Sequence, residues 1–186
     1  MTLIRDKTST GLSGEYYVLA QLAHRGLVGA LTLSNTKAVD ILVSNAALRR
    51  VYKLEVKTTQ KGPVRERLFG EEPSFRWPMS VKHEKVGESR LYYCFVVLAA
   101  PTTRPHFFIV PSSYVAWYVR EEHRHWRASR RRAVATTSLR TFRIPLGDPD
   151  GFEDNWRVFT KRGRGPANNQ LQRTRARWRR SSRPRR

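Results

Sequence analysis

The chain has little cysteine, few acidic residues and no long apolar segment, and each shortage excludes a class of protein. Cys94 is the single cysteine among 186 residues, so no disulfide can form within the chain and no cysteine-rich metal site is available. No apolar run approaches the roughly 18 residues that a membrane-spanning helix needs. The first residues also lack the apolar region of a signal peptide. We therefore expect a soluble cytoplasmic protein with Cys94 in its core.

Acidic residues are outnumbered by basic ones, 15 to 36, and the formal net charge is +21. Residues 161–186 hold 11 Lys and Arg and no acid, but residues 1–160 still hold 25 basic and 15 acidic residues. This excess predicts a polyanionic partner, most simply a nucleic acid. We expect one domain at 1–160 and a disordered basic tail at 161–186. The tail either binds nucleic acid without sequence preference or is an extension of no consequence.

The order of apolar patterns and breakers predicts an α/β fold. A helix at 11–24 is expected to bury a stripe that includes Leu12, Tyr16 and Leu22, and Gly26 is expected to end it. Glycines and prolines make 61–79 irregular. The other expected elements are strands at 28–34, 38–44, 51–57, 91–99, 106–110 and 139–144, a helix at 112–127, and a surface return through Trp156.

Two of these strands each carry one carboxylate. Asp40 lies in Val-Asp-Ile-Leu-Val, and Glu55 and Lys57 lie in Tyr-Lys-Leu-Glu-Val-Lys. Side chains alternate along a strand, so Glu55 and Lys57 share a face. A hairpin centred between Ala47 and Leu48 sets Asp40 opposite Glu55, where the two carboxylates would repel each other. Such a pair is usually kept because a divalent cation lies between the acids. The alternative is a pair of solvent-facing residues in weak surface ion pairs.

These residues resemble the PD-(D/E)xK nuclease superfamily, which has the restriction-endonuclease-like fold. The resemblance covers residues 11–60 best, although Val39 stands where the family motif has its proline. It implies an αβββαβ core, with a central mixed sheet flanked by helices. It also implies that Asp40 and Glu55 bind Mg²⁺ or Mn²⁺, that Lys57 positions or activates the attacking water, and that Glu15 joins the metal shell. Gln60 takes the place of a polar residue beside the site.

A chemical argument supports the same assignment. Phosphodiester hydrolysis needs charge neutralisation on the phosphoryl oxygens, and Mg²⁺ requires only one or two carboxylates from the protein. Lys57 could act through a lowered pKa or by stabilising charge in the transition state. Glu15 could instead be a helix N-terminal acid, and Gln60 a simple polar residue after a strand.

Basic residues elsewhere are candidates for phosphate contact. These are Lys82, His83, Arg124, Arg127, Arg130, Arg131 and Arg132. We interpret the aromatic residues Trp117, Tyr118 and Trp126 as core rather than as a surface for base stacking, and the other histidines as structural.

The sequence therefore predicts a metal-dependent deoxyribonuclease with DNA as its partner. An endonuclease is favoured over an exonuclease, and a homodimer is one expectation. Two alternatives stay open. The first is a nucleic-acid-binding protein that keeps the fold without catalysis, and the second is a basic protein-interaction module.

Overall fold

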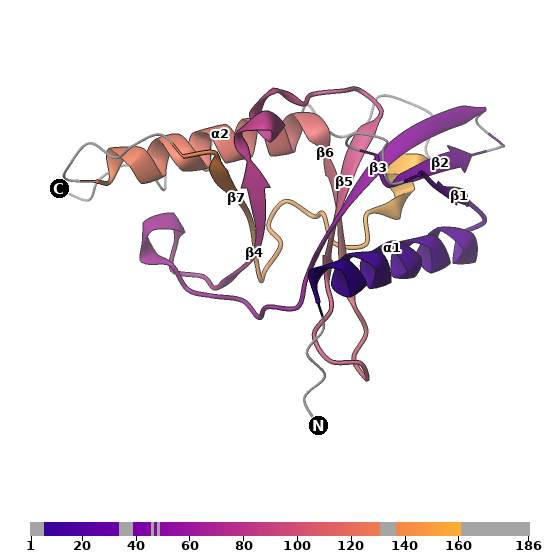
Figure 1. Cartoon of the computed structure of the whole chain (residues 1–186), viewed down its shortest axis with the longest axis horizontal. Coiled ribbons are helices and arrows are strands. Elements are labelled where there is room, and N and C mark those ends of the chain that lie inside the picture. Colours follow the sequence, from indigo (N-terminus) through magenta and orange to yellow (C-terminus); the bar gives the residue numbers. More distant parts are fainter. Residues whose placement is uncertain (1–5, 34–38, 46, 48, 131–136, 161–186) are drawn as a thin grey trace.

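The computed structural model describes residues 6–33, 39–45, 47, 49–130 and 137–160 (Figure 1). Its main elements are α1 (Lys7–His24), β1 (Val28–Leu31), β2 (Ile41–Asn45), β3 (Arg50–Thr59), β4 (Ser74–Ser80), β5 (Leu91–Val97), β6 (His106–Pro111), α2 (Ser112–Ala128) and β7 (Leu139–Pro145). Short 3₁₀ helices η2 (Arg67–Phe69), η3 (Val81–Lys85) and η4 (Trp156–Phe159) lie between or after them. No helix in the described ranges is long and apolar enough to cross a membrane. The expected basic tail lies outside these ranges.

The central sheet is mixed, as the sequence predicts. Its strand order is β1-β2-β3-β5-β6. The first three strands are antiparallel, β3 runs parallel to β5, and β6 is antiparallel to β5. Ile41 pairs with Leu54 and Val43 with Tyr52, which is the register that a hairpin centred between residues 47 and 48 requires. Just outside this ladder, the backbone N–H of Asp40 donates to Leu54 O at 2.9 Å, which places Asp40 beside Leu54 and Glu55 of β3.

Two hydrophobic cores lie on opposite faces of this sheet. One core packs α1 and η4 against one face, and the other packs β4, β7 and α2 against the opposite face (Figure 1). Strand β5 serves both cores: Tyr92 and Cys94 enter the first, while Tyr93 and Phe95 enter the second. All seven of its residues are buried, which confirms the expected buried central strand.

Helix α1 begins earlier and buries a different face than the sequence predicts. Asp6 caps it, because its side chain accepts a hydrogen bond from the backbone N–H of Ser9 at 2.7 Å. Gly26 follows its end with a φ of 69°, so the expected stop is confirmed. The buried residues are Gly14, Val18 and Leu22. Two residues of the expected stripe, Leu12 and Tyr16, are exposed. Gly14 determines which face of α1 is buried, because a residue without a side chain allows the helix to approach β3 closely.

The expectation of an irregular segment at 61–79 is wrong at its C-terminal end. Strand β4 occupies Ser74–Ser80 and pairs with β7, with Pro78 opposite Thr141. In a two-stranded sheet every strand is an edge, and an edge tolerates the missing N–H of a proline. Trp77 then becomes fully buried in the second core.

The expected surface return through Trp156 is also wrong. Trp156 is 3% exposed and Phe159 is fully buried. Both belong to η4, which packs against Tyr52 and Tyr92 in the first core. Asn45 Nδ2 donates to Phe159 O at 2.7 Å, which ties the end of the described chain to β2.

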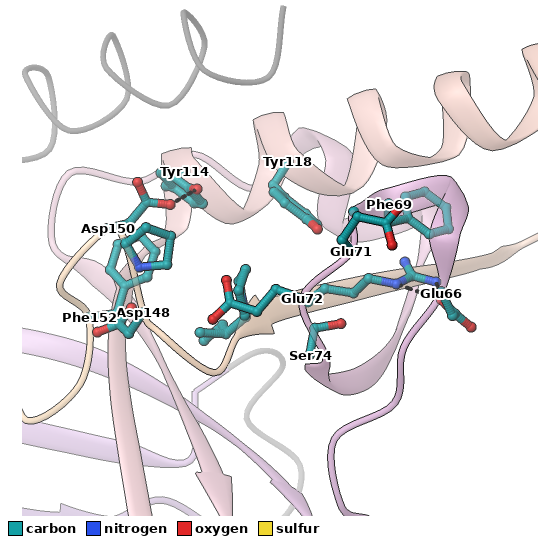
Figure 2. Close-up of a pocket in the computed structure, with 15 residues that line it drawn as sticks. Glu66, Phe69, Glu71, Glu72, Ser74, Tyr114, Tyr118, Asp148, Asp150 and Phe152 are labelled. Atoms are coloured by element: carbon teal, nitrogen blue, oxygen red, sulfur yellow. Dashed lines mark hydrogen bonds and ion pairs between the residues drawn. The ribbon is translucent and has the colours of Figure 1, made fainter. Parts of the chain in front are cut away.

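A charged network joins β4, β7 and α2. Arg143 donates to Glu66 at 2.6 Å and 2.9 Å, contacts Glu122, and lies over the ring of Phe69. Arg76 also reaches Glu66, at 2.5 Å. Glu66 lines a pocket of about 300 Å³, whose wall includes Tyr114 and Tyr118 of α2 (Figure 2). None of the site residues predicted from the sequence lines this pocket.

We predict that Gly14→Ala destabilises the protein. A Cβ at this position would lie 2.0 Å from Thr58 Oγ1, so α1 would have to move away from β3. We expect a cost of about 1–3 kcal/mol from overpacking. Gly11→Ala, in the same helix, is the matched control. Its Cβ would meet nothing within 4 Å, and helix propensity would stabilise it by up to about 1 kcal/mol. Urea unfolding measures both, and equal stability of the two variants would contradict the packing argument.

We also predict a pH-dependent contribution from Glu66. Burial alone would raise the pKa of Glu66, but hydrogen bonds and ion pairs with Arg143 and Arg76 outweigh burial and lower it. A lowered pKa stabilises the folded state above the unfolded value of 4.5. Glu66→Gln should therefore cost about 1–3 kcal/mol at neutral pH. This difference should disappear as the pH falls through the folded pKa.

Unfolding of both proteins between pH 3 and pH 7 measures the effect of Glu66. Glu71→Gln removes the same charge from an exposed neighbouring position and is the control. A difference between wild type and Glu66→Gln that stays constant over this range would exclude the ionised Glu66 as the source.

Candidate metal and catalytic centre

Asp40 lies just before β2 and is half-buried. Its Oδ2 accepts a hydrogen bond from the backbone N–H of Val56 at 2.6 Å, so the side chain is held against β3. Burial raises the pKa of Asp40, and the charge of Glu55 adds to this effect, while the Val56 N–H and Lys57 act against it. The net result is a carboxylate that is less acidic than an ordinary Asp.

Glu55 is buried on the face of β3 that looks toward the second core, and only 3% of the residue is exposed. Its Oε1 lies 2.7 Å from Lys57 Nζ and 3.5 Å from His83 Nε2. Its Oε2 is buried and has no hydrogen-bond partner. Burial alone would raise the pKa of Glu55, but the contact with His83 and the charge of Lys57 lower it to about 2. Glu55 is therefore a buried, ionised carboxylate, which excludes the alternative of a solvent-facing residue.

Lys57 connects this buried acid to solvent. Its side chain is 31% exposed while its ammonium stays in contact with Glu55. Lys53 shares this face of β3 but forms an exposed ion pair with Glu88 instead. The two lysines of the motif therefore have separate environments, and only Lys57 contacts the candidate site.

Glu15 approaches the same site from α1. It is half-buried, and burial and the charge of Asp40 raise its pKa, while Lys57 lowers it. The three groups are therefore close enough to interact electrostatically. Gly14, which precedes Glu15, makes this possible because a larger residue would collide with Thr58 of β3. Gln60 is exposed one residue beyond the end of β3.

The donor set can be compared with what a magnesium ion needs. Across the part of the chain that the structure describes, no three His, Cys, Asp or Glu side chains are grouped so that they could hold a metal ion. Magnesium, however, takes only one or two carboxylates and keeps several waters. Two features fit such a site: the buried Glu55 Oε2 without a partner, and the mutual repulsion of Asp40 and Glu55. The pair Asp40 and Glu55 therefore fits Mg²⁺ chemically, and Glu15 lies near it.

The predicted phosphate contacts have different environments. Lys82 is exposed, whereas His83 is only 5% exposed and lies against Glu55. His83 therefore lies in the interior of the candidate site and not on the surface where a phosphate contact was expected. Sequence patterns offer no signal for this contact, because His83 and Glu55 are brought together only by the folded segment between β3 and β5.

Helix α2 presents an exposed row of arginines. Arg124 and Arg127 are exposed, and so is Arg130 just after the helix, where it lies over Trp126. Arg120 lies on the same side at helical spacing and was not among the predicted phosphate contacts, although this spacing could have identified it. Arg131 and Arg132 lie outside the described residues. Two of the aromatic residues assigned to the core, Trp117 and Tyr118, are buried in the second core as expected, while Trp126 is half-buried.

Comparisons with known proteins find similarity at the level of structure. No family model matches the sequence, and no curated protein matches it. A bacterial homing endonuclease, I-Ssp6803I, is similar in structure, with a TM-score of 0.52 and 11% sequence identity over 95% of this chain and 99% of that chain. Hjc, a Holliday junction resolvase of Archaeoglobus fulgidus, gives a TM-score of 0.42 and 17% identity over 82% of this chain and 98% of that chain. The chain therefore has the restriction-endonuclease-like fold that the sequence resemblance implied.

Proposed function

We propose that this protein is a Mg²⁺-dependent deoxyribonuclease that cleaves DNA internally. The observation that carries the proposal is the buried, ionised Glu55 in contact with Lys57 and beside Asp40. Burying a carboxylate is costly unless its charge is compensated. Here the compensation comes from a lysine that reaches solvent, where a phosphate can approach. The fold and the net charge of +21 agree with a nucleic-acid substrate.

In this proposal Asp40 and Glu55 hold the metal ion, and Glu15 completes its surroundings. Bound Mg²⁺, or Mn²⁺ in its place, would neutralise charge on the phosphoryl oxygens and assist the attacking water. Lys57 is held in an ion pair with Glu55, and an ammonium in this position favours stabilisation of the developing negative charge as its role. Water adds across the P–O3′ bond, which leaves a 5′-phosphate and a 3′-hydroxyl.

The arginines of α2 are proposed to bind the DNA backbone. Arg120, Arg124 and Arg127 are exposed along one side of the helix, although Glu121 forms ion pairs with the first two. Phosphate contacts supply affinity and orientation without reading sequence. The proposal therefore includes binding of DNA with little sequence preference from this helix.

One observation favours the non-catalytic alternative. In the described ranges, no three metal-binding side chains are grouped into a ready metal site, and Oε1 of Glu55 already faces Lys57 and His83. A protein of this kind would bind DNA with a steep salt dependence and would not cleave it.

We predict Mg²⁺-dependent cleavage that requires Lys57. Lys57→Ala should lower the single-turnover rate on plasmid DNA by about 10²–10³-fold, the usual effect of removing one group that stabilises charge in the transition state. Glu55→Gln should have an effect at least as large. Lys53→Ala is the matched control, because Lys53 lies on the same face of the same strand and pairs with Glu88 at the surface. Activity that persists in EDTA, or that is unchanged in Lys57→Ala, would contradict the proposal.

We also predict that the arginine row contributes phosphate contacts. Replacing Arg120, Arg124 and Arg127 with Gln should weaken DNA binding equally for unrelated sequences. The slope of log K against log salt should fall by about 1 for each phosphate that is no longer bound. Arg104→Gln removes an equally exposed charge from the loop between β5 and β6 and should leave the slope nearly unchanged. Fluorescence anisotropy at several salt concentrations measures both, and equal slopes for the two variants would remove α2 from the binding surface.

A further inference from the structure

A buried polar cluster lies behind Glu55, on the side of the second core. His83 comes from η3 and Tyr93 from β5, where it pairs directly with Glu55 in the parallel ladder. The rings of His83 and Tyr93 are 6.0 Å apart in an edge-on arrangement. Within the described residues, three atoms here are buried without a hydrogen-bond partner: Glu55 Oε2, His83 Nε2 and Tyr93 Oη. Buried polar groups are rarely left unpaired, so this concentration of them calls for a functional explanation.

The orientation of His83 is set by its own segment. The backbone N–H of Ser80 donates to His83 Nδ1 at 3.0 Å, as part of a capping box in which the Ser80 side chain accepts from the backbone of His83. The Ser80 N–H can only donate and therefore favours a ring proton on Nε2, whereas Ser80 O, also 3.0 Å from Nδ1, can only accept and favours a proton on Nδ1. Nε2 is the ring nitrogen that faces Glu55 Oε1, at 3.5 Å. A proton on Nε2 would therefore point at the carboxylate.

Tyr93 is a further group beside the carboxylate of Glu55. Burial and the negative charge of Glu55 raise the pKa of Tyr93, so its hydroxyl keeps its proton beside the acid. Lys57 approaches Oε1 from the solvent side at 2.7 Å. Glu55 is thus surrounded by Tyr93, Lys57 and His83, and the last two face Oε1.

We propose that His83 is a positioning residue that holds Oε1 of Glu55 from inside the protein, so that Oε2 stays available as the metal-binding atom. This inference rests on the proposed nuclease function and goes beyond it, because it assigns a role to the segment between β3 and β5. Active-site hydrogen bonds are often long in the absence of ligands and shorten when the site is occupied. The distance of 3.5 Å between Nε2 and Oε1 fits a contact of this kind. Outer groups that orient a metal ligand typically change metal affinity by about 10–100-fold when they are removed.

A purely structural role for His83 makes a different prediction. If His83 only closes the capping box of η3, its replacement should lower stability and leave the metal affinity of the folded protein unchanged. A positioning role requires that metal affinity falls even where the protein stays folded. It also requires that a side chain with an N–H group in the same place restores the affinity.

The test compares Mn²⁺ binding to the full-length protein without DNA, measured from the EPR signal of free Mn²⁺. His83→Leu removes the donor, and His83→Gln keeps an N–H group at a similar distance from the backbone. His123→Leu is the matched control, because His123 is also buried, with an Nε2 that lacks a hydrogen-bond partner, and it packs on Trp126 of α2. Circular dichroism and thermal unfolding define the folded fraction of each protein.

We expect His83→Leu to weaken Mn²⁺ binding by about 10–100-fold, His83→Gln to restore most of the affinity, and His123→Leu to bind as the wild type does. Unchanged affinity in folded His83→Leu would overturn the positioning role and leave the nuclease proposal intact. A wild-type protein that neither binds Mn²⁺ nor cleaves DNA would instead overturn the nuclease proposal, and the role of His83 with it.

A second measurement tests the inference even if His83→Leu fails to fold. The ¹⁵N resonances of the His83 ring in the metal-free wild-type protein report which nitrogen carries the proton. We expect Nε2–H. A ring that carries its proton on Nδ1 would have no donor toward Glu55 and would overturn the proposal.

Discussion

The antiparallel register between β2 and β3 is the constraint on which the candidate site depends. It brings Asp40 beside Glu55, and it directs Glu55 and Lys57 to the face that the second core covers. A shift by one residue would send every side chain of a strand to the other face. Glu55 would then enter the first core, among the apolar side chains of Ile41, Cys94 and Ile109. The register is therefore protected by the cost of burying an uncompensated charge.

The same argument explains why the surroundings of Glu55 are so specific. A carboxylate at this depth is unfavourable unless donors and cations compensate it. Lys57 and His83 supply this compensation on Oε1, and their effect exceeds that of burial, since the pKa of Glu55 falls. Asp40 shows the opposite balance, because burial dominates there and its pKa rises. Two acids on adjacent strands thus differ in acidity for reasons that lie in their separate neighbours.

The sequence is informative where a local pattern determines the structure. The turn position predicts the β2–β3 register, and the continuous apolar run of β5 predicts a strand buried on both faces. The shared face of Glu55 and Lys57 follows from alternation along a strand alone. The contact between His83 and Glu55 cannot be predicted in this way, because it joins residues 28 positions apart through an irregular segment. Strand β4 is not predicted because Pro78 interrupts its sequence pattern. The burial of Trp156 is not predicted either, because it depends on a core that forms from strands distant in the sequence. The buried face of α1 differs from the predicted one because a prediction from hydrophobic spacing does not count Gly14. This glycine determines how closely the helix packs against β3.

Strand β5 carries a consequence for how the molecule unfolds. Its alternate side chains belong to different cores, with Cys94 and Val96 on one side and Phe95 and Val97 on the other. If the elements on either face of the sheet separated from it, they would expose β5, against which the elements on the opposite face also pack. The two cores share one backbone, so we expect that loss of packing beneath α1 also affects α2 and that the described residues unfold as one cooperative unit.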